Sequence, residues 1–295
     1  MIEHGQKGRL AALTLIGALS FLGSMAMGQT TQPDRTANLG RGLKAREAML
    51  EIFRKKDPAA VDRYFSEPFI QHDVAVPDGL PGLKALAAEV AASPDANITI
   101  YRTLVDGEFV LLHSKYKGLP GHAGPMIGFD LFRFRGDKIV EHWCGQEPEA
   151  PPNPSGRTQV DGPADVVDRD KTELNRALVR SFKQVITVDL KFDRVGEFID
   201  ADHYMQHASK VGDGMAQMKA RVAEVVKPGT EPVLRPRLYI ADGNFVLVLV
   251  EAHAKGGPTS NYDLFRVENG KIVEHWDVLA PVPPREQWKN ANGPY

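Results

Sequence analysis

The chain has 295 residues, a formal net charge of −2 at pH 7, 42% hydrophobic residues and 25% charged residues. This length accommodates two ordinary domains, and the composition is typical of a globular protein. Lys and Arg are not clustered in any block, which disfavours nucleic acid as a partner. The one cysteine, Cys144, excludes an intramolecular disulfide and a cysteine-rich metal site.

The first 28 residues have the pattern of a secretory signal peptide. A basic start with Lys7 and Arg9 precedes an apolar run at 10–27, which ends in small residues suited to signal peptidase. The alternative is an uncleaved anchor, because the apolar run approaches the length of a bilayer span. We favour cleavage, which predicts a periplasmic or secreted protein without stable membrane insertion. The polar residues 29–38 are predicted to form a disordered tether.

The next segment, residues 39–147, is predicted to be the first domain. An amphipathic helix at 39–57 and a short helix at 58–65 come first. A short strand at 69–72 and an Ala- and Leu-rich helix at 81–92 follow. Four strands joined by glycine-containing hairpin turns complete the domain, at 98–105, 109–116, 126–134 and 138–144.

A Pro-rich segment at 148–167 is predicted to be a semi-rigid linker. The order of elements then repeats in a second domain, 168–285, before a C-terminal tail at 286–295. Helices are expected at 170–188, 194–199 and 215–226, and strands at 204–207, 237–241, 245–253, 261–267 and 271–279.

The two predicted domains share one motif. Residues 130–144 and 263–277 align without a gap, and ten of these fifteen positions are identical. Both contain Asp-Leu-Phe-Arg followed by Lys-Ile-Val-Glu-His-Trp. A separation of this size indicates a duplicated domain rather than a solenoid repeat. The last aligned position differs: Cys144 in the first copy stands where Asp277 stands in the second.

These residues resemble the SnoaL-like branch of the NTF2-like superfamily, whose members include polyketide cyclases. The resemblance rests on the short strand ending in Gln-His, the Asp-Gly hairpin and the closing Glu-His-Trp-Asp motif. It implies an α+β fold with two tandem cones, each with three helices packed on a curved antiparallel sheet. The fold hosts cyclases, isomerases, dehydratases, epoxide hydrolases and non-catalytic binding domains, so it does not fix the function.

Asp277 is the predicted acid–base residue, because the resemblance places a catalytic Asp at this position. His275 shares its strand face, and His207 on the first strand of the copy is a predicted catalytic partner. A two-residue turn at Asn269-Gly270 pairs Tyr262 with Asp277, which turns Asp263 to the opposite face. The predicted substrate-binding residues of this copy are Tyr262, Leu264 and Leu249. The alternative is a surface or salt-bridged Asp277 with a structural role.

In the first copy, His72, His113 and His142 are expected to converge in the cone and to contact substrate, together with Cys144. Three histidines could bind a metal, but the sequence lacks a short ligand spacing, and we predict no metal. Cys144 and His142 could form a nucleophilic pair, although a buried inert thiol is the simpler interpretation.

Trp143 and Trp276 are expected on the sheet face opposite the histidines, with Phe132, Phe134 and Phe265. Such an aromatic face favours an interface. We therefore predict that the two copies pack together as an internal pseudo-dimer, with a homodimer as the further expected assembly.

Two functions follow from these interpretations. The first is an exported, cofactor-independent acid–base enzyme that acts on a small hydrophobic molecule in the second cone, of the cyclase, isomerase, dehydratase or epoxide hydrolase type. No glycine-rich nucleotide motif is visible. The alternative is a non-catalytic periplasmic binding or interaction module whose cones hold a hydrophobic ligand.

Overall fold

The structure is a computed structural model that describes residues 35–225, 233–254 and 256–295. The predicted signal peptide and most of the predicted tether lie outside these residues. Residues 33–295 form one compact unit. No helix among the described residues is long and apolar enough to span a membrane.

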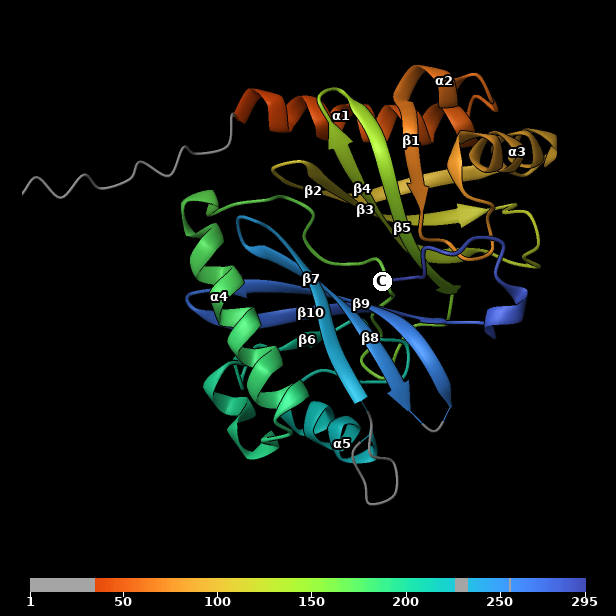
Figure 1. The fold of residues 1–295 in the computed structure, drawn as a ribbon. Helices are drawn as coiled ribbons and strands as arrows, with labels where there is room; N and C mark the ends of the chain where they lie inside the picture. Colours follow the sequence, from red (N-terminus) through yellow and green to blue (C-terminus); the bar gives the residue numbers. More distant parts are fainter. Residues whose placement is uncertain (1–34, 226–232, 255) are drawn as a thin grey trace, which may run out of the picture. The chain divides into compact units, whose positions relative to one another are not determined.

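The first half of this unit contains three helices and one sheet (Figure 1). The helices are α1 (Arg35–Phe53), α2 (Ala60–Tyr64) and α3 (Gly79–Ala92), and β1 (Phe65–Gln71) lies between the last two. A meander follows with β2 (Asn97–Asp106), β3 (Phe109–Lys117), β4 (Met126–Arg135) and β5 (Lys138–Pro148). The five-stranded sheet has the order β1-β5-β4-β3-β2. The β1–β5 pair is parallel, which corrects the expectation of an antiparallel sheet.

The second half has a sheet of the same strand order, β6-β10-β9-β8-β7. It begins with η1 (Arg169–Lys171), α4 (Thr172–Phe182), the π-helical turn η2 (Lys183–Val188) and the 3-10 helix η3 (Phe192–Glu197). Next come β6 (Met205–Gln206) and α5 (Met215–Val225). The meander consists of β7 (Val233–Asp242), β8 (Phe245–Ala254), β9 (Gly257–Glu268) and β10 (Lys271–Pro281), and η4 (Arg285–Gln287) follows it. Here too the first strand, β6, pairs in parallel with the last.

Three apolar clusters hold these layers together. One lies between α1–α3 and the inner face of the first sheet, and another lies between α4, η2, η3 and the inner face of the second sheet. The third lies between the outer faces of the two sheets and includes Trp143 and Trp276. The helices therefore cover the outside of the unit and the sheets face each other inside it (Figure 1).

A β-bulge sets the register of the last hairpin in both halves. The Asn269-Gly270 turn forms as predicted, with Glu268 opposite Lys271, but Val273 is an extra residue in β10. Val140 is the extra residue in β5. A bulge shifts every later pair by one position, so Asp277 lies opposite Asp263 rather than Tyr262. The predicted pairing was wrong beyond the bulge.

The bulges also correct the predicted aromatic faces. Phe132 stacks on His142, with ring centroids 4.9 Å apart, and Phe265 stacks on His275 at 4.7 Å. Both phenylalanines belong to the helix-covered clusters, as does Phe134, whereas the two tryptophans lie between the sheets.

Two segments cross from one half of the unit to the other; we call residues 149–168 the first strap and residues 282–295 the second strap. In the first strap, the Asn153 side chain donates to the carbonyls of Gln206 and Val211, at 2.6 and 2.9 Å. In the second strap, Asn290 donates to the carbonyls of Asp73 and Val76, at 2.7 and 2.9 Å. Each segment that leaves one sheet thus braces the first strand of the other.

Gly145 of the first sheet packs closely against Tyr262 of the second sheet. A Cβ added there would lie 2.4 Å from the Tyr262 ring. We expect Gly145→Ala to lower the free energy of unfolding by about 1–3 kcal/mol, because the buried ring cannot move without strain. Urea denaturation measures this, with Gly124→Ala as the control, since no heavy atom lies within 4 Å of its added Cβ. Equal stability of both variants would contradict close packing of the sheets.

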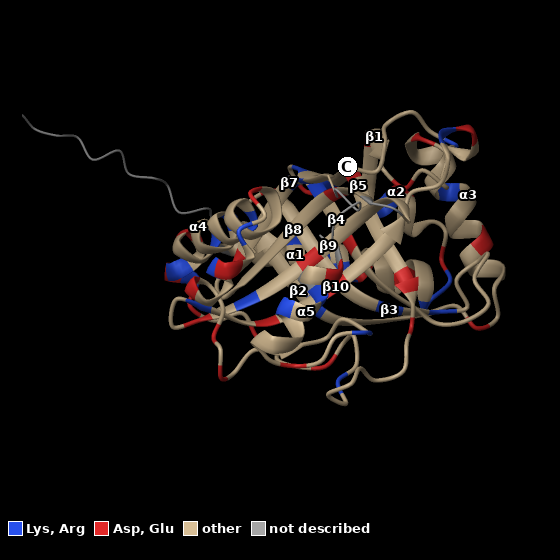
Figure 2. Ribbon diagram, turned by 90° about the horizontal axis from the view of Figure 1, so that it is seen from below, with Lys and Arg blue, Asp and Glu red and all other residues tan. Residues whose placement is uncertain are grey.

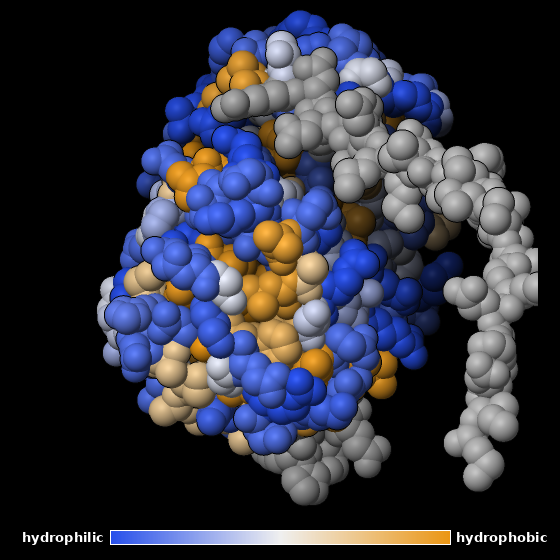
Figure 3. All heavy atoms as spheres, turned by 90° about the vertical axis from the view of Figure 1, so that its left-hand side faces the viewer, coloured by the Kyte–Doolittle hydropathy of each residue, from blue (hydrophilic) through white to orange (hydrophobic). Residues whose placement is uncertain are grey.

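The surface carries charges of both signs. Lys and Arg are interspersed with Asp and Glu in the view of Figure 2. Figure 3 shows apolar side chains gathered near the middle of one face. Leu39, Leu43 and Leu174 are each more than half exposed, at 55%, 61% and 71%. The predicted homodimer stays a prediction.

Candidate functional site

A cavity of about 430 Å³ lies between the inner face of the second sheet and the helical elements that cover it. Its apolar wall includes Phe182, Ile186 and Val250. Its polar wall includes Glu147, Lys183, Gln206, Asp263, His275 and Asp277, and Lys210, Arg221 and Asn261 also line the cavity. The cavity therefore combines an apolar interior with a small group of ionisable side chains, as small-molecule sites commonly do.

His275 is held at both ring nitrogens. Nε2 lies 3.0 Å from Asp263 Oδ1, and Nδ1 lies 3.0 Å from Gln206 Oε1. The Gln206 oxygen also accepts from the backbone N–H groups of His207 and Ala208, each at 2.9 Å, which identifies it as the acceptor. The two ring nitrogens thus both face acceptors, which fixes the orientation of the imidazole.

Lys183 places an ammonium group in the cavity wall, beside Asp263. Its Nζ lies 2.7 Å from Asp263 Oδ2 and 5.2 Å from the centre of the Phe265 ring, and its side chain is only 7% exposed. The lysine begins the π-helical turn η2, in which the Asp189 N–H donates to the Gln184 carbonyl at 2.8 Å. π-Helical turns are frequent at functional sites. Sequence reasoning missed Lys183, because lysine is equally common in ordinary surface helices.

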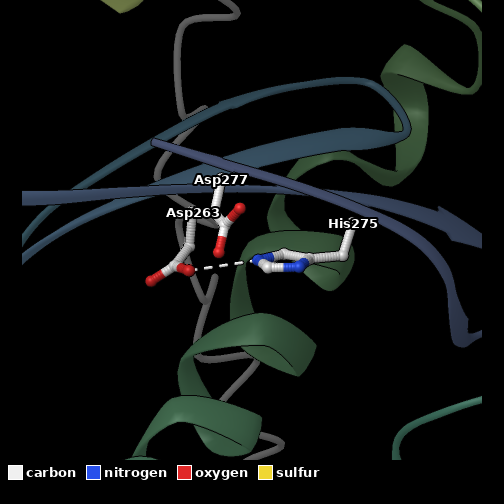
Figure 4. A group of neighbouring side chains, drawn as sticks. All are labelled: Asp263, His275 and Asp277. Carbon is white, nitrogen blue, oxygen red and sulfur yellow. Dashed lines mark hydrogen bonds and ion pairs between the residues drawn. The ribbon is translucent and has the colours of Figure 1, made fainter. Parts of the chain in front are cut away.

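The pKa values of Asp263 and Asp277 are shifted in opposite directions because the two carboxyls have different partners (Figure 4). Burial acts to raise the pKa of Asp263, but Lys183 and His275 together hold it well below its usual range. Burial raises the pKa of Asp277; His275 opposes this effect and the negative charge of Asp263 adds to it. No described residue forms a hydrogen bond or ion pair with the Asp277 carboxylate. Asp277 is therefore the carboxyl that is poised to exchange a proton.

Glu147 brings a residue of the first half into this cavity. It lies near the end of β5, and its Oε2 accepts from the Leu279 N–H at 3.2 Å. The Gln159 side chain of the first strap donates to its other oxygen. Burial raises the pKa of Glu147, and the negative charge of Asp277 raises it further. The wall of the second cavity is thus complete only when both halves are present.

Asp263, His275 and Asp277 are of the types that bind metals, and their ligand atoms lie within 4.8 Å of one another. The contacts that these side chains already make disfavour metal binding. Both His275 nitrogens are engaged, and the Lys183 ammonium already neutralises Asp263. A metal would have to displace one of these contacts, so the arrangement fits proton transfer better.

The other predicted residues of the second copy lie elsewhere. His207 does not join Asp277: its Nε2 lies 2.8 Å from Glu274 Oε1, and its ring stacks on Trp276. Tyr262, Leu264 and Leu249 belong to the cluster between the sheets and do not line the cavity. Asp263, expected on the opposite face, lines it instead. The one-residue bulge explains why Tyr262, Asp263 and Leu264 of β9 lie on the faces opposite to those predicted, because it exchanges the two faces of β9 relative to β10.

The first half has a cavity of about 380 Å³, and of the predicted residues His142 and Cys144 line it. His142 Nε2 lies 3.2 Å from Asp130 Oδ1, in the same arrangement as His275 and Asp263. His72 and His113 do not converge on it. His72 stacks on Trp143, and His113 stacks on Phe129 in the cluster between the sheets. The predicted three-histidine group is therefore not formed.

Cys144 is the least reactive of these candidates. Burial raises the pKa of its thiol well above the usual range, and the nearby Asp73 and Asp130 add to the effect. The thiol donates to Asp73 Oδ2 at 3.5 Å and makes no hydrogen bond to His142. This arrangement does not generate a thiolate, so the nucleophilic Cys–His pair is not supported.

The raised pKa of Asp277 has a measurable consequence for stability. An unfolded Asp has a pKa of about 3.9, so the native state binds this proton more tightly than the unfolded state does. Asp277 therefore contributes stability below that value and loses the contribution as pH rises through its native pKa. We expect Asp277→Asn to be more stable than the wild type at neutral pH, by up to about 1 kcal/mol. Urea unfolding should show this difference growing from about pH 4 to neutrality; a pH-independent difference would contradict it.

The comparisons with known proteins agree with the sequence resemblance. The profile of the SnoaL-like domain matches residues 47–142. No curated protein sequence matches the chain. Among solved structures, the chain is similar to an NTF2-like protein from Burkholderia xenovorans LB400, at 19% identity and a TM-score of 0.34, over 43% of this chain and 100% of that one.

Two further solved structures match a similar share of this chain. TsrD from Streptomyces laurentii is 17% identical over 39% of this chain and 92% of its own, with a TM-score of 0.33. An NTF2-like protein from Mesorhizobium loti is 21% identical over 39% of this chain and 97% of its own, with a TM-score of 0.33. The profile match identifies a SnoaL-like domain at residues 47–142.

Proposed function

We propose that residues 168–285 form a second SnoaL-like domain, and that the two domains are tandem cones which pack as an internal pseudo-dimer. The equal strand order of the two sheets supports the duplication. The apolar cluster shared by the outer sheet faces supports the pseudo-dimer.

We further propose that the second cavity carries out cofactor-independent acid–base chemistry of the isomerase or cyclase type. The observation that carries this proposal is the Asp277 carboxyl, which lines the cavity without a partner among the described residues and has a raised pKa. An Asp with a structural role is normally paired or solvated. A carboxylate with a raised pKa is a stronger base, suited to removing a proton from carbon near neutral pH.

The reaction can be written with the side chains in place. The Asp277 carboxylate accepts a proton from a carbon next to a carbonyl, and the electron pair of the C–H bond moves onto the carbonyl oxygen. The Lys183 ammonium, which has three donors and uses one on Asp263, is available to stabilise that oxygen. In a β,γ-unsaturated ketone, protonated Asp277 then returns its proton to the γ-carbon of the dienolate, which moves the double bond and isomerises the substrate. Alternatively, the nucleophilic α-carbon attacks a second carbonyl carbon in the same molecule and closes a ring, and the alkoxide that forms takes the proton from Asp277.

Two neighbours position these catalytic residues. Asp263 holds Lys183 and His275, and His275 opposes the effect of burial on the pKa of Asp277. Asn261, also in the wall, has a side-chain oxygen with no partner among the described residues. That oxygen suits a hydroxyl or N–H donor on the substrate. The substrate class is therefore a small, mostly apolar carbonyl compound with one such donor.

Hydrogen–deuterium exchange tests the proposal without knowledge of the product. The full chain is incubated in D2O with a panel of apolar ketones and β-dicarbonyl compounds, and loss of the α-proton signal is followed by NMR. We expect exchange above the buffer rate for at least one compound, and none above it with Asp277→Asn. Exchange that is equal in both proteins would reject Asp277 as the base. The absence of exchange across the panel would favour the non-catalytic binding module.

A further inference from the structure

The cavity of the first half offers a different chemistry from that of the second. Its wall is mostly apolar and includes Met49, Phe53 and Leu83. Of its three carboxylates, Glu89 is exposed and the other two are engaged: Asp130 accepts from His142 and from the Tyr116 hydroxyl, and Asp73 accepts from the Cys144 thiol. Where the second half has Asp277, this half has a thiol that burial keeps protonated. Among the described residues, the first cavity thus has no carboxyl at the position that Asp277 occupies in the second.

One polar group in this cavity wall is left without a partner. The Gln71 side chain lines the cavity and is fully buried, at 0% exposure. Its Oε1 accepts from the Asp73 N–H and from His142 Nδ1, both at 3.0 Å, which identifies Nε2 as the amide nitrogen. That nitrogen has no hydrogen-bond partner among the described residues. A buried donor without an acceptor is costly, and such groups are normally satisfied by protein, water or ligand.

The second half shows how the same glutamine is satisfied internally. Gln206 Nε2 donates to the Tyr204 hydroxyl at 3.2 Å. The corresponding residue of the first half is Phe69, which has no hydroxyl. The loss of one oxygen atom at this position therefore releases an amide donor in the first cavity and not in the second.

We propose that the first cavity is a recognition site for a small, neutral, mostly apolar molecule whose carbonyl oxygen accepts a hydrogen bond from Gln71 Nε2. The apolar wall provides the affinity, and the amide donor fixes the orientation. An anionic ligand is disfavoured, because Asp73 and Asp130 already place negative charge in the wall. The site binds without acid–base turnover, which divides the two halves into a recognition cavity and a reaction cavity.

The test uses Prodan, a neutral naphthyl ketone dye whose emission moves to longer wavelength when its carbonyl accepts a hydrogen bond. The parent dimethylaminonaphthalene, which lacks the carbonyl, is the matched ligand. We expect the full-length chain to bind Prodan with a hydrogen-bonded emission, and to bind the parent roughly 3- to 10-fold more weakly, the range expected for one neutral hydrogen bond.

Phe69→Tyr is the decisive variant, because it offers Gln71 the internal acceptor that Gln206 has. We expect it to weaken Prodan binding by roughly 3- to 10-fold, to shift the bound emission to shorter wavelength and to leave binding of the parent unchanged. The converse variant, Tyr204→Phe, should leave the Prodan affinity unchanged. If Phe69→Tyr fails to fold, Gln71→Met removes the donor by another route and should give the same selective loss.

The cavity that is occupied is identified by a matched pair of tryptophan variants. Ala75 and Lys210 occupy equivalent positions in the repeat, are exposed, and each lines one cavity. Ala75→Trp should abolish carbonyl-dependent binding, and Lys210→Trp should preserve it. Asp277→Asn should also bind Prodan normally, so a failure of the acid–base proposal would leave this one standing. No Prodan binding, an unchanged carbonyl preference in Phe69→Tyr, or loss of binding with Lys210→Trp alone would each overturn the proposal.

Discussion

Replacing Asp277 with Asn is expected to lower turnover by roughly 10²- to 10⁴-fold, the usual contribution of a positioned general acid–base group. The amide keeps the shape of the side chain but cannot accept the proton. Because no described residue bonds to the Asp277 carboxylate, the substitution removes no structural contact. The fold should therefore be retained, and the loss should appear in kcat rather than in KM alone.

Two variants make this result specific. Asp277→Glu moves the carboxylate by one methylene and should retain part of the activity, because the group is present but misplaced. Glu268→Gln removes an exposed carboxylate from the same hairpin and should leave turnover unchanged. Steady-state kinetics on the compound that exchanges deuterium, with circular dichroism as the folding check, measures all three. Turnover of Asp277→Asn within threefold of the wild type would exclude general-base catalysis by Asp277.

Replacing Lys183 with Met is expected to lower the free energy of unfolding by about 3–5 kcal/mol, the cost of leaving one partner of a buried ion pair alone. Lys183 Nζ lies 2.7 Å from Asp263 Oδ2, and both side chains are largely buried, at 7% and 13% exposure. Methionine fills nearly the same space as lysine, so the decrease in the free energy of unfolding reports the removal of the charge. His275 keeps one bond to Asp263 and is expected to limit the loss to the lower part of this range.

The double variant Lys183→Met with Asp263→Asn provides the control. If the buried charge of Asp263 causes the loss, its removal should restore part of the stability, and the two single changes should not add. Urea denaturation of the full chain at neutral pH measures the four proteins of this cycle. Additive losses, or a loss below about 1 kcal/mol for Lys183→Met, would show that the pair does not hold the cavity wall.

Local signals in the sequence were sufficient for most elements and for part of the site. The alternation of apolar residues and the turn at Asn269-Gly270 located the strands and hairpins. The resemblance directed attention to Asp277, and the alternation of side chains along a strand placed His275 on the same face. Lys183, Gln206 and Glu147 were not expected there, because a lysine in a helix, a glutamine in a strand and a glutamate near a strand end are ordinary residues until their neighbours are known.

The errors have one main physical cause. A β-bulge inserts one residue without any required sequence signature in these strands, and the side-chain period of a strand is two. The extra residue Val273 therefore turned Asp263 from the outer face to the cavity and turned Tyr262 and Leu264 towards the other sheet. The predicted aromatic faces changed for the same reason at Val140.

The repeated Glu-His-Trp motif by itself predicts two related halves, since the repetition is a relation between residues that can be read directly from the sequence. It also marked the difference between Cys144 and Asp277. Tertiary structure alone decided what that difference means. Burial and the charges of Asp263 and Lys183 shift the pKa of Asp277, and Glu147 enters its cavity from the other half; all of this depends on distances between residues far apart in the chain.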